Sequence, residues 1–273
     1  MHPILFHIGP VPVRAYGVAV LLGFLLGLAY AMAAARRQLL RKPPPGCERL
    51  TPEHVFDFAM VALVVAVIGA RALYVAMDWH EFRDNPLDAL RVWTGGLSIY
   101  GSIAASLAYM AWFCRRRRLD FLTLADIGAP SFALGYAIGR VGCFLNGCCY
   151  GAECHLPWAV RFAAEGDPGH LTPPSHPTQL YAAAINLVWF ILLDRWSRRS
   201  QRRGEILIGY LLLYSVYRFV VEQFRKGATA TLFAYGLTHA QAFSLAAIPV
   251  LLFLLLKLRR TPRPALGEEP PRD

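Results

Sequence analysis

The chain has 273 residues, 56% of them hydrophobic, and carries a formal net charge of +10. Soluble domains contain about 45–50% apolar residues, so the composition argues against an ordinary soluble domain, and the mean hydropathy of +0.38 agrees. The basic residues stand at the ends of apolar runs, which indicates membrane topology and not nucleic-acid binding. We therefore predict an all-α integral membrane protein with no nucleic-acid partner.

Apolar runs recur along the chain at lengths that suit membrane spans. A spanning helix needs about 20 apolar residues, and the runs at 17–35 and 97–114 contain no charged residue. No small-residue cleavage pattern follows the first run, so we interpret it as a retained span and not as a signal peptide. We predict about seven transmembrane helices, at 17–35, 55–77, 97–114, 121–139, 178–194, 205–224 and 238–257.

Clusters of basic residues follow the first, third, fifth and seventh segments. They are Arg36, Arg37, Arg41, Lys42 and Arg49; Arg115 to Arg118; Arg195, Arg198, Arg199, Arg202 and Arg203; and Lys257, Arg259, Arg260, Arg263 and Arg272. Basic loops stay in the cytoplasm, which predicts an outer N-terminus and a cytoplasmic C-terminus. We expect one polytopic domain over 1–258, an outer loop region at about 140–177 and a disordered cytoplasmic tail at 259–273.

Four arginines lie toward the outer half of the predicted spans: Arg71, Arg140, Arg218 and Arg225. A charge at membrane depth costs roughly 2.5–3.5 kcal/mol on insertion scales, so such residues often serve a function. Arg218 and Glu222 are also spaced to form an ion pair on one helix face, which is the structural alternative. Several guanidinium groups at one depth favour an anionic phosphate, and the natural one there is a phospholipid head group.

Aromatic and polar residues accompany these arginines. Tyr16, Tyr100 and Tyr214 are candidate site residues, although tyrosine is also common in interfacial belts. His176 opens the fifth segment, where it is either a helix-entrance residue or a catalyst, and Gln179 follows on the same predicted helix face.

Seven motifs occur in order between about residues 2 and 245: HPILFHIGPVPVRAYG, GARALY, RVWTGGLSIYG, GRVGCFLNGCCYG, HPTQLY, YSVYRFVVEQFR and LTHAQAFSL. Together they resemble the prolipoprotein diacylglyceryl transferase family, whose signature is similar to the stretch Arg140 to Gly151. The resemblance implies transfer of the diacylglyceryl group of phosphatidylglycerol to the thiol of a lipobox cysteine, with formation of a thioether and release of glycerol phosphate.

The resemblance also implies where the protein acts and what it meets. The place is the outer, periplasmic side of the bacterial inner membrane. The partners are phosphatidylglycerol, prolipoprotein signal peptides with a lipobox cysteine, and membrane lipids. Neither a cofactor nor a metal is expected.

The motif positions imply roles for individual residues, to which we add Tyr100 and His176 as candidate proton acceptors and Gln179 from its helix face. The predicted catalytic residues are Arg140, Arg218, Tyr100, Tyr16 and His176. The predicted substrate-binding residues are Arg140, Asn146, Gly151, Arg71, Tyr214, Gln179, Glu222 and Arg225. The lipid phosphate itself is a third candidate acceptor, because a thiol with a pKa near 8.5 is already a few per cent ionised at neutral pH.

The sequence departs from the family pattern at three places. Tyr100 stands where the family often has a histidine, Ala182 follows HPTQLY where it often has a glutamate, and Cys143 replaces a frequent asparagine. These changes leave the identity of the base open. They also leave a paralogue that binds lipid or lipoprotein without turnover as an alternative, beside a membrane anion transporter, against which the absence of a visible inverted repeat argues.

Four cysteines cluster in the predicted outer loop as C-x4-C-C-x4-C: Cys143, Cys148, Cys149 and Cys154. A disulfide suits an oxidising compartment, and small packing residues are the other favoured interpretation. The spacing is not the paired CxxC of common zinc sites. We expect the reacting thiol to come from the substrate protein.

Overall fold

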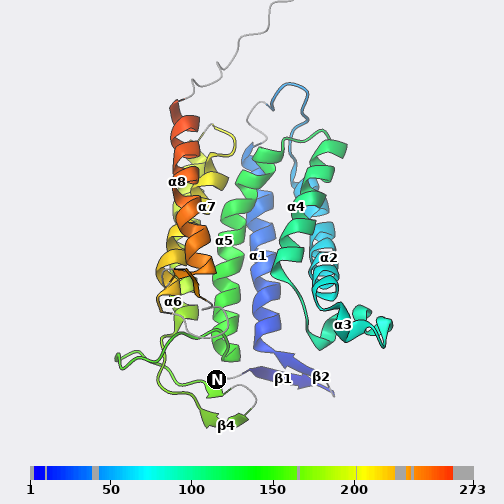
Figure 1. Cartoon of the computed structure of the whole chain (residues 1–273). Helices are drawn as coiled ribbons and strands as arrows, with labels where there is room; N and C mark the ends of the chain where they lie inside the picture. Colours follow the sequence, from blue (N-terminus) through cyan, green and yellow to red (C-terminus); the bar gives the residue numbers. More distant parts are fainter. Residues whose placement is uncertain are drawn as a thin grey trace, which may run out of the picture. The chain divides into compact units, whose positions relative to one another are not determined.

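The computed structural model describes residues 3–9, 11–38, 43–164, 167–200, 202–224, 232–234 and 237–260, and these are mostly helical (Figure 1). The α-helices of this described part are α1 (Ala15–Gln38), α2 (Pro52–Met77), α3 (Trp79–Phe82), α4 (Ile99–Arg116), α5 (Phe121–Asn146), α6 (Thr178–Arg199), α7 (Glu205–Glu222) and α8 (His239–Arg260). Two short 3-10 helices, η1 (Pro86–Leu90) and η2 (Val92–Thr94), join α3 to α4.

Short antiparallel hairpins, which were not predicted from the sequence, accompany the helices. They pair β1 (Ile4–Ile8) with β2 (Val11–Arg14), β3 (Ala163–Ala164) with β4 (Asp167–Leu171), and β5 (Leu232–Ala234) with β6 (Leu237–Thr238). The all-α prediction therefore holds for the helices and misses these strands. The predicted tail from residue 261 onward lies outside the described residues.

Four helices of the described part are long and apolar enough to cross a membrane: α1, α2, α5 and α8. With these helices the protein is an integral membrane protein. The predicted spans at 97–114, 178–194 and 205–224 do form helices, namely α4, α6 and α7, but these do not reach the same combination of length and apolar composition. The number of spans beyond four stays a prediction.

The chain divides into two compact units. Unit 1 comprises Met1–Gly27 and Ala125–Asp273, and unit 2 comprises Leu28–Leu124. The division cuts α1 after Gly27 and α5 before Ala125. One domain over 1–258 stays a prediction.

In unit 1, glycines bring α1 close to α5. A Cβ atom built on Gly23 would lie 2.9 Å from the carbonyl oxygen of Gly135, and one built on Gly27 would lie 3.1 Å from that of Ser131. Small residues permit such backbone contact between membrane helices, and Gly23 and Gly27 have GxxxG spacing. The N-terminal part of α1 is thus fixed against the helix that carries Arg140.

The core of unit 1 is built mainly from α5, α6 and α7. Its buried residues include Ala133, Leu193 and Tyr210, with Trp189 and Trp196 packed against them. At the end of unit 1 where α7 begins, the Asp126 carboxylate of α5 accepts hydrogen bonds from the backbone N–H groups of Gly204 at 2.6 Å and Leu207 at 2.8 Å. A side chain of one helix therefore caps another, which satisfies N–H groups that a helix start leaves free.

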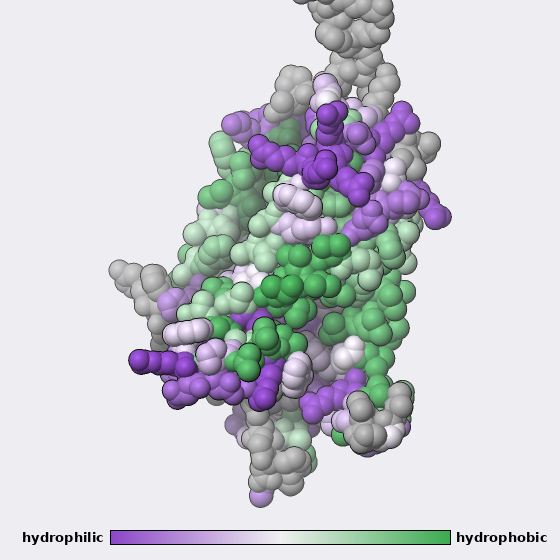
Figure 2. All heavy atoms as spheres, turned by 90° about the vertical axis from the view of Figure 1, so that its right-hand side faces the viewer, coloured by the Kyte–Doolittle hydropathy of each residue, from purple (hydrophilic) through white to green (hydrophobic). Residues whose placement is uncertain are grey.

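In unit 2, α2 packs along α4. Gly69 and Gly101 allow the contact, because a Cβ atom on Gly69 would lie 2.7 Å from the carbonyl oxygen of Gly101. Figure 2, which looks onto the side of Figure 1 where α2 and α4 lie, shows hydrophobic side chains over the middle of this face and hydrophilic ones toward both ends. Such a band is expected where helices meet lipid.

Candidate functional site

Three helix ends meet around the loop that follows α5, all within unit 1. The Oγ1 atom of Thr178, the first residue of α6, donates to the carbonyl of Cys149 at 3.0 Å, and Nε2 of Gln179 donates to that of Cys148 at 2.7 Å. The N–H group of Ala152 donates to the carbonyl of Phe224, just beyond α7, at 2.7 Å. The signature loop therefore joins the end of α5, the start of α6 and the end of α7.

Gly151 lies where these three parts are closest. Its N–H group donates to the carbonyl of His176 at 2.9 Å. A Cβ atom here would lie 2.4 Å from the carbonyl oxygen of Phe224, 2.7 Å from Cγ2 of Thr178 and 2.9 Å from Cβ of His176. Gly151 thus has a packing role, and its predicted part in substrate binding stays a prediction.

Arg140 lies on the last turns of α5 and is half-buried. Its Nη2 atom donates to the phenol oxygen of Tyr136 at 2.5 Å, and its Cζ atom lies 4.7 Å from the centre of that ring. Among the described residues, no carboxylate forms a salt bridge with it. The guanidinium group stays charged in proteins, so the described part of unit 1 leaves this positive charge without an anionic neighbour.

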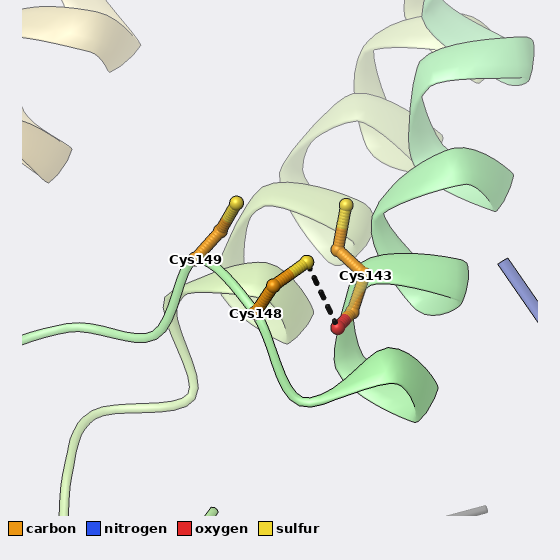
Figure 3. Close-up of side chains that lie close together, drawn as sticks. All are labelled: Cys143, Cys148 and Cys149. Atoms are coloured by element: carbon orange, nitrogen blue, oxygen red, sulfur yellow. Dashed lines mark hydrogen bonds between the residues drawn. The ribbon is translucent and has the colours of Figure 1, made fainter. Parts of the chain in front are cut away.

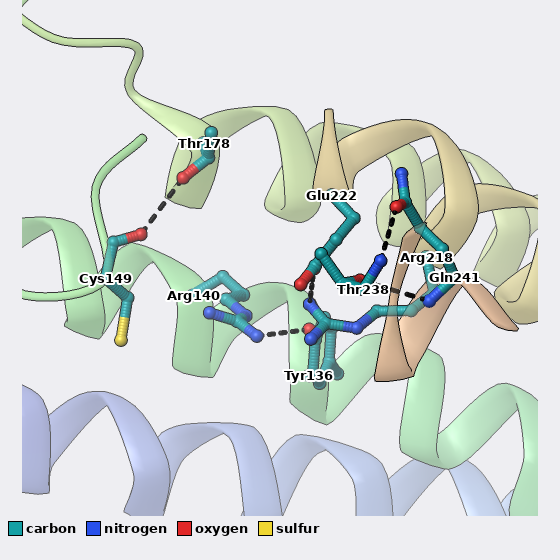
Figure 4. Close-up of polar contacts among 8 residues, drawn as sticks. All are labelled: Tyr136, Arg140, Cys149, Thr178, Arg218, Glu222, Thr238 and Gln241. Carbon is teal, nitrogen blue, oxygen red and sulfur yellow. Dashed lines mark hydrogen bonds and ion pairs between the residues drawn. The ribbon is translucent and has the colours of Figure 1, made fainter. Parts of the chain in front are cut away.

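Arg218 is held differently. Its Nη1 atom lies 3.0 Å from Oε2 of Glu222, whose carboxylate side chain is fully buried, while the Arg218 side chain is 21% exposed. The ion pair that the spacing allowed is therefore present, and the predicted part of Arg218 in the reaction stays a prediction. Figure 4 shows Arg140 of α5 and Arg218 of α7 pointing toward the same region, where Tyr136 lies. Two cations and one carboxylate leave this region with an excess of positive charge.

Tyrosines surround the two arginines. The Tyr136 and Tyr214 ring centres are 6.3 Å apart in an edge-to-face arrangement, and those of Tyr214 and Tyr217 are 6.0 Å apart. Tyr136 and Tyr214 also pack against a small core that includes Ala182 and Tyr217. Tyr136 was missed by the sequence reasoning, although its position one turn before Arg140 was a usable signal.

Tyr16, at the start of α1, reaches this region because Gly142 of α5 has no side chain. A Cβ atom on Gly142 would lie 2.6 Å from Cβ of Ala19 and 3.4 Å from Cα of Tyr16. Tyr16 is 45% exposed and lies within electrostatic range of Arg140 and Cys143. Unit 1 thus brings together Tyr16, Arg140, Tyr214, Arg218 and Glu222, whose predicted roles stay predictions.

His176 and Gln179 border the same loop. The His176 ring packs against Phe224, and its Nδ1 atom lies 3.3 Å from the phenol oxygen of Tyr181. Gln179 is fully buried, and its Oε1 atom meets no hydrogen-bond partner among the described residues. The amide of Gln179 supports the loop through Nε2, and its Oε1 atom is left to accept a further hydrogen bond.

The start of α8 is fixed by a reciprocal cap. The N–H group of Thr238 donates to Oε1 of Gln241 at 3.0 Å, and the N–H group of Gln241 donates to Oγ1 of Thr238 at 3.2 Å. This cap orders the start of the LTHAQ motif, and Figure 4 draws it on the side of Arg218. The motif thus has a structural role as the capped N-terminus of α8.

Two further predicted site residues belong to unit 2. Arg71 of unit 2 donates hydrogen bonds to the backbone carbonyls of Asp88, Ala89, Gly95 and Gly96 at 2.7–3.0 Å, so its guanidinium group holds the loop between α3 and α4. Tyr100 is the second residue of α4, also in unit 2, and its side chain is 75% exposed. Arg225 lies outside the described residues. Their predicted roles stay predictions.

Asn146 ends α5 and leads into a group of three thiols that was not predicted as a site. Cys143, Cys148 and Cys149 place their sulfur atoms within 4.8 Å of one another. A hydrogen bond with the Cys143 thiol lowers the pKa of Cys148, but the Cys149 thiol and burial outweigh it, so the pKa of Cys148 is raised on balance. The Cys148 sulfur is therefore a neutral thiol at neutral pH unless something displaces its proton.

Comparison with known proteins identifies the family. The family model described as prolipoprotein diacylglyceryl transferase matches residues 3–257. A phosphatidylglycerol–prolipoprotein diacylglyceryl transferase of Geobacillus kaustophilus is 37% identical over 94% of this chain and 92% of its own length. Proteins of the same name from Lysinibacillus sphaericus and Streptococcus sanguinis are each 32% identical over 97% of this chain, and over 95% and 99% of their own lengths. The chain belongs to the prolipoprotein diacylglyceryl transferase family.

Proposed function

We propose that the protein transfers the diacylglyceryl group of phosphatidylglycerol to the lipobox cysteine of a prolipoprotein. The family and its named relatives support this reaction. The observation in the structure that carries the proposal is Arg140, a half-buried cation that meets a phenol and no carboxylate among the described residues. Such a charge is costly unless an anion compensates it, and a lipid phosphate at the membrane interface supplies that anion.

Arg218 is the second phosphate ligand of the proposal. Its ion pair with Glu222 fixes the side chain through one nitrogen, Nη1, and within the described part of the chain Nε and Nη2 are left to bind an oxyanion. Guanidinium groups bind phosphate through parallel hydrogen bonds, which fixes both the position and the orientation of the group. Arg140 and Arg218 then hold one phosphate between α5 and α7.

The chemical step is a substitution at the glycerol CH2 carbon that carries the phosphate. A carbon–sulfur bond forms from the lipobox cysteine, the carbon–oxygen bond breaks, and the phosphate leaves as glycerol phosphate with the bonding electron pair. Charge builds on the leaving phosphate, where two fixed guanidinium groups stabilise it in a site of low dielectric constant. Holding both substrates in line supplies a further part of the acceleration.

The proton of the attacking thiol needs an acceptor. His176 and the lipid phosphate are the candidates on the side of unit 1, and Tyr100 is the candidate in unit 2. The Nδ1 atom of the half-buried His176 ring lies 3.3 Å from the phenol oxygen of Tyr181, a contact that orients the ring of this candidate general base. No cofactor enters this scheme.

The distribution of charge supports an outer, periplasmic site in a seven-span protein of the bacterial inner membrane. In unit 1, the basic ends of α6 and α8 lie at the end opposite the signature loop, where Nε of Arg259 pairs with Glu205 at 3.0 Å. In unit 2, Arg115 and Arg116 end α4, whereas the segment between α2 and α4 carries four of the unit's eight acidic residues. Because basic loops usually stay in the cytoplasm, this distribution supports an outer position for the Arg140 end of unit 1.

The direct test uses the purified full-length protein in nanodiscs that contain phosphatidylglycerol, with a synthetic lipobox peptide. We expect the peptide to gain the mass of a diacylglyceryl group, and a peptide with serine in place of the cysteine to gain nothing. Arg140→Gln is expected to lower the rate about 100-fold or more. Arg195→Gln, a matched loss of one exposed arginine at the far end of α6, should leave the rate unchanged.

The same assay separates the two alternatives. A folded wild-type protein that binds phosphatidylglycerol but yields no thioether would refute the transferase and identify a paralogue that binds without turnover. Ala182, which stands where the family often has a glutamate, is 1% exposed and packs beside Tyr217 and Val221. This position therefore supplies packing and no carboxylate, and the assay shows whether transfer proceeds without that carboxylate. Anion flux into vesicles without thioether formation would identify a transporter instead.

A further inference from the structure

The three-thiol cluster of Cys143, Cys148 and Cys149 is created by the backbone at the end of α5. The N–H groups of Gly147 and Cys148 donate to the carbonyls of Phe144 and Cys143, which is the hydrogen-bond pattern of a Schellman helix end. Gly147 has a φ of 77°, as this motif requires. The chain therefore folds back on the last turn of the helix and carries Cys148 toward Cys143.

Cys149, which follows Cys148, also has a backbone conformation with positive φ. Cys149 has a φ of 64°, a left-handed conformation that side chains other than glycine and asparagine rarely adopt. Such strain costs of order 1–3 kcal/mol and is found where the surroundings fix a functional geometry. Here it turns the Cys149 thiol to the side of the other two, and Figure 3 shows the three sulfur atoms gathered between α5 and the loop.

The positions of the thiols are supported from outside the cluster. Thr178 and Gln179 hold the carbonyls of Cys149 and Cys148 at 3.0 and 2.7 Å, and the Sγ atom of Cys148 lies 3.7 Å from the carbonyl oxygen of Cys143. These hydrogen bonds fix the backbone that carries the thiols. The loop is therefore organised before any ligand arrives.

We propose that Cys143, Cys148 and Cys149 form a binding site for one Cu(I) ion, held by three thiolates. Sulfur atoms on a three-coordinate ion with bonds of about 2.3 Å lie about 4 Å apart, which fits atoms that are within 4.8 Å of one another. Thiolates select soft ions such as Cu(I). Each thiol releases one proton when it binds, and no electron is transferred.

The ligand set favours copper over zinc. Structural zinc sites take four protein ligands, whereas the described residues supply only the three thiols to this group, with no histidine or carboxylate among them. Zinc would need water as a fourth ligand. Solvent can reach the cluster through the exposed Cys149, but the described residues supply no fourth protein ligand. The site therefore suits a three-coordinate ion better than a tetrahedral one.

The test measures metal binding by the full-length protein, reduced and kept without oxygen in detergent. Cu(I) is supplied from a coloured chelator complex in competition, and the bound metal is counted after desalting. We expect one Cu(I) per chain, with only sulfur neighbours in X-ray absorption spectra, and Zn²⁺ bound more weakly. Cys148→Ser and Cys149→Ser should each abolish tight binding.

Cys154→Ser is the matched control, because Cys154 lies in the same loop but outside the cluster, and it should bind copper as the wild type does. Thermal unfolding of each variant shows that the fold is kept. The proposal is overturned if the reduced wild type binds no Cu(I), if Cys148→Ser and Cys149→Ser bind it as tightly, or if Zn²⁺ binds more tightly. A disulfide within the cluster in protein taken directly from cells, found by peptide mass mapping, would also overturn it.

Discussion

Arg140 donates a 2.5 Å hydrogen bond to the phenol oxygen of Tyr136, and its Cζ atom also lies 4.7 Å from the centre of the same ring. The two residues are one helical turn apart on α5, so a single helix fixes the direction of the guanidinium group. A hydrogen bond to a phenol does not pair the guanidinium group with a carboxylate, so the positive charge is available to an anionic substrate. Tyr136 is thus a positioning residue for Arg140 in the proposed reaction.

Tyr136→Phe should keep the ring and lose the hydrogen bond. A hydrogen bond to a charged group contributes about 1.5–3 kcal/mol, so we expect kcat/KM for phosphatidylglycerol to fall about tenfold or more. Steady-state kinetics with a lipobox peptide measures this, and Tyr109→Phe in unit 2 is the control. An unchanged kcat/KM would show that Arg140 is positioned without the phenol.

Gly151→Ala should disturb the junction of α5, α6 and α7. The added methyl group would lie 2.4 Å from the carbonyl oxygen of Phe224, and such overpacking costs about 1–3 kcal/mol. We expect a lower melting temperature together with reduced transfer. Gly128→Ala, where a Cβ atom would meet nothing within 4 Å, is the control, and equal behaviour of the two variants would contradict the packing argument.

Arg71→Lys tests whether Arg71 supports the loop or binds substrate. One ammonium group does not reproduce the hydrogen bonds to four carbonyls, so we expect about 2 kcal/mol of lost stability and faster proteolysis between α3 and α4. Arg91→Lys, at an exposed ion pair, should change neither. Normal stability with a raised KM for phosphatidylglycerol would instead place Arg71 in substrate binding.

Asp126→Ala should weaken the start of α7. The carboxylate accepts two backbone hydrogen bonds there, from Gly204 and Leu207, and loss of a helix cap typically costs about 1–2 kcal/mol. Thermal unfolding in detergent should therefore show a lower melting temperature. Asp57→Ala, which removes an exposed carboxylate 3.8 Å from Arg117, should have little effect, and similar losses in both would argue against the cap.

Copper bound to the three-thiol cluster should raise the KM for phosphatidylglycerol. Three thiolates around Cu(I) are negatively charged, and Cys143 lies within electrostatic range of Arg140, so the cluster would compete with the lipid phosphate. Kinetics with and without Cu(I) measures the effect, which Cys148→Ser should lose and Cys154→Ser should keep. A copper-loaded protein with normal kinetics would separate the metal site from the reaction.

The helices were largely predictable because long apolar runs leave few alternatives. The segment 17–35 lies within α1, and the segment 238–257 lies within α8 except for Thr238, which ends β6. The segment 121–139 was ended too early, since α5 continues through Arg140 to Asn146. A charge marks where an apolar run stops, but it does not end a helix, and the turn at Gly147 does. The short hairpins carry too little pattern to be found.

The site was predictable where spacing along one helix decides contact. The positions of Arg218 and Glu222 allowed an ion pair, and the structure shows it at 3.0 Å. Contacts made by folding back were not predictable. The spacing of Cys143, Cys148 and Cys149 resembles no common metal motif, because the sulfur atoms meet only after α5 ends and the chain reverses.

Thr178 and Gln179 hold the signature loop by the peptide oxygens of residues 149 and 148. Every amino acid offers that oxygen, so the anchoring of the loop does not depend on which side chains stand at the two positions. Exchange of either cysteine would therefore leave in place the two hydrogen bonds that attach the loop to the start of α6.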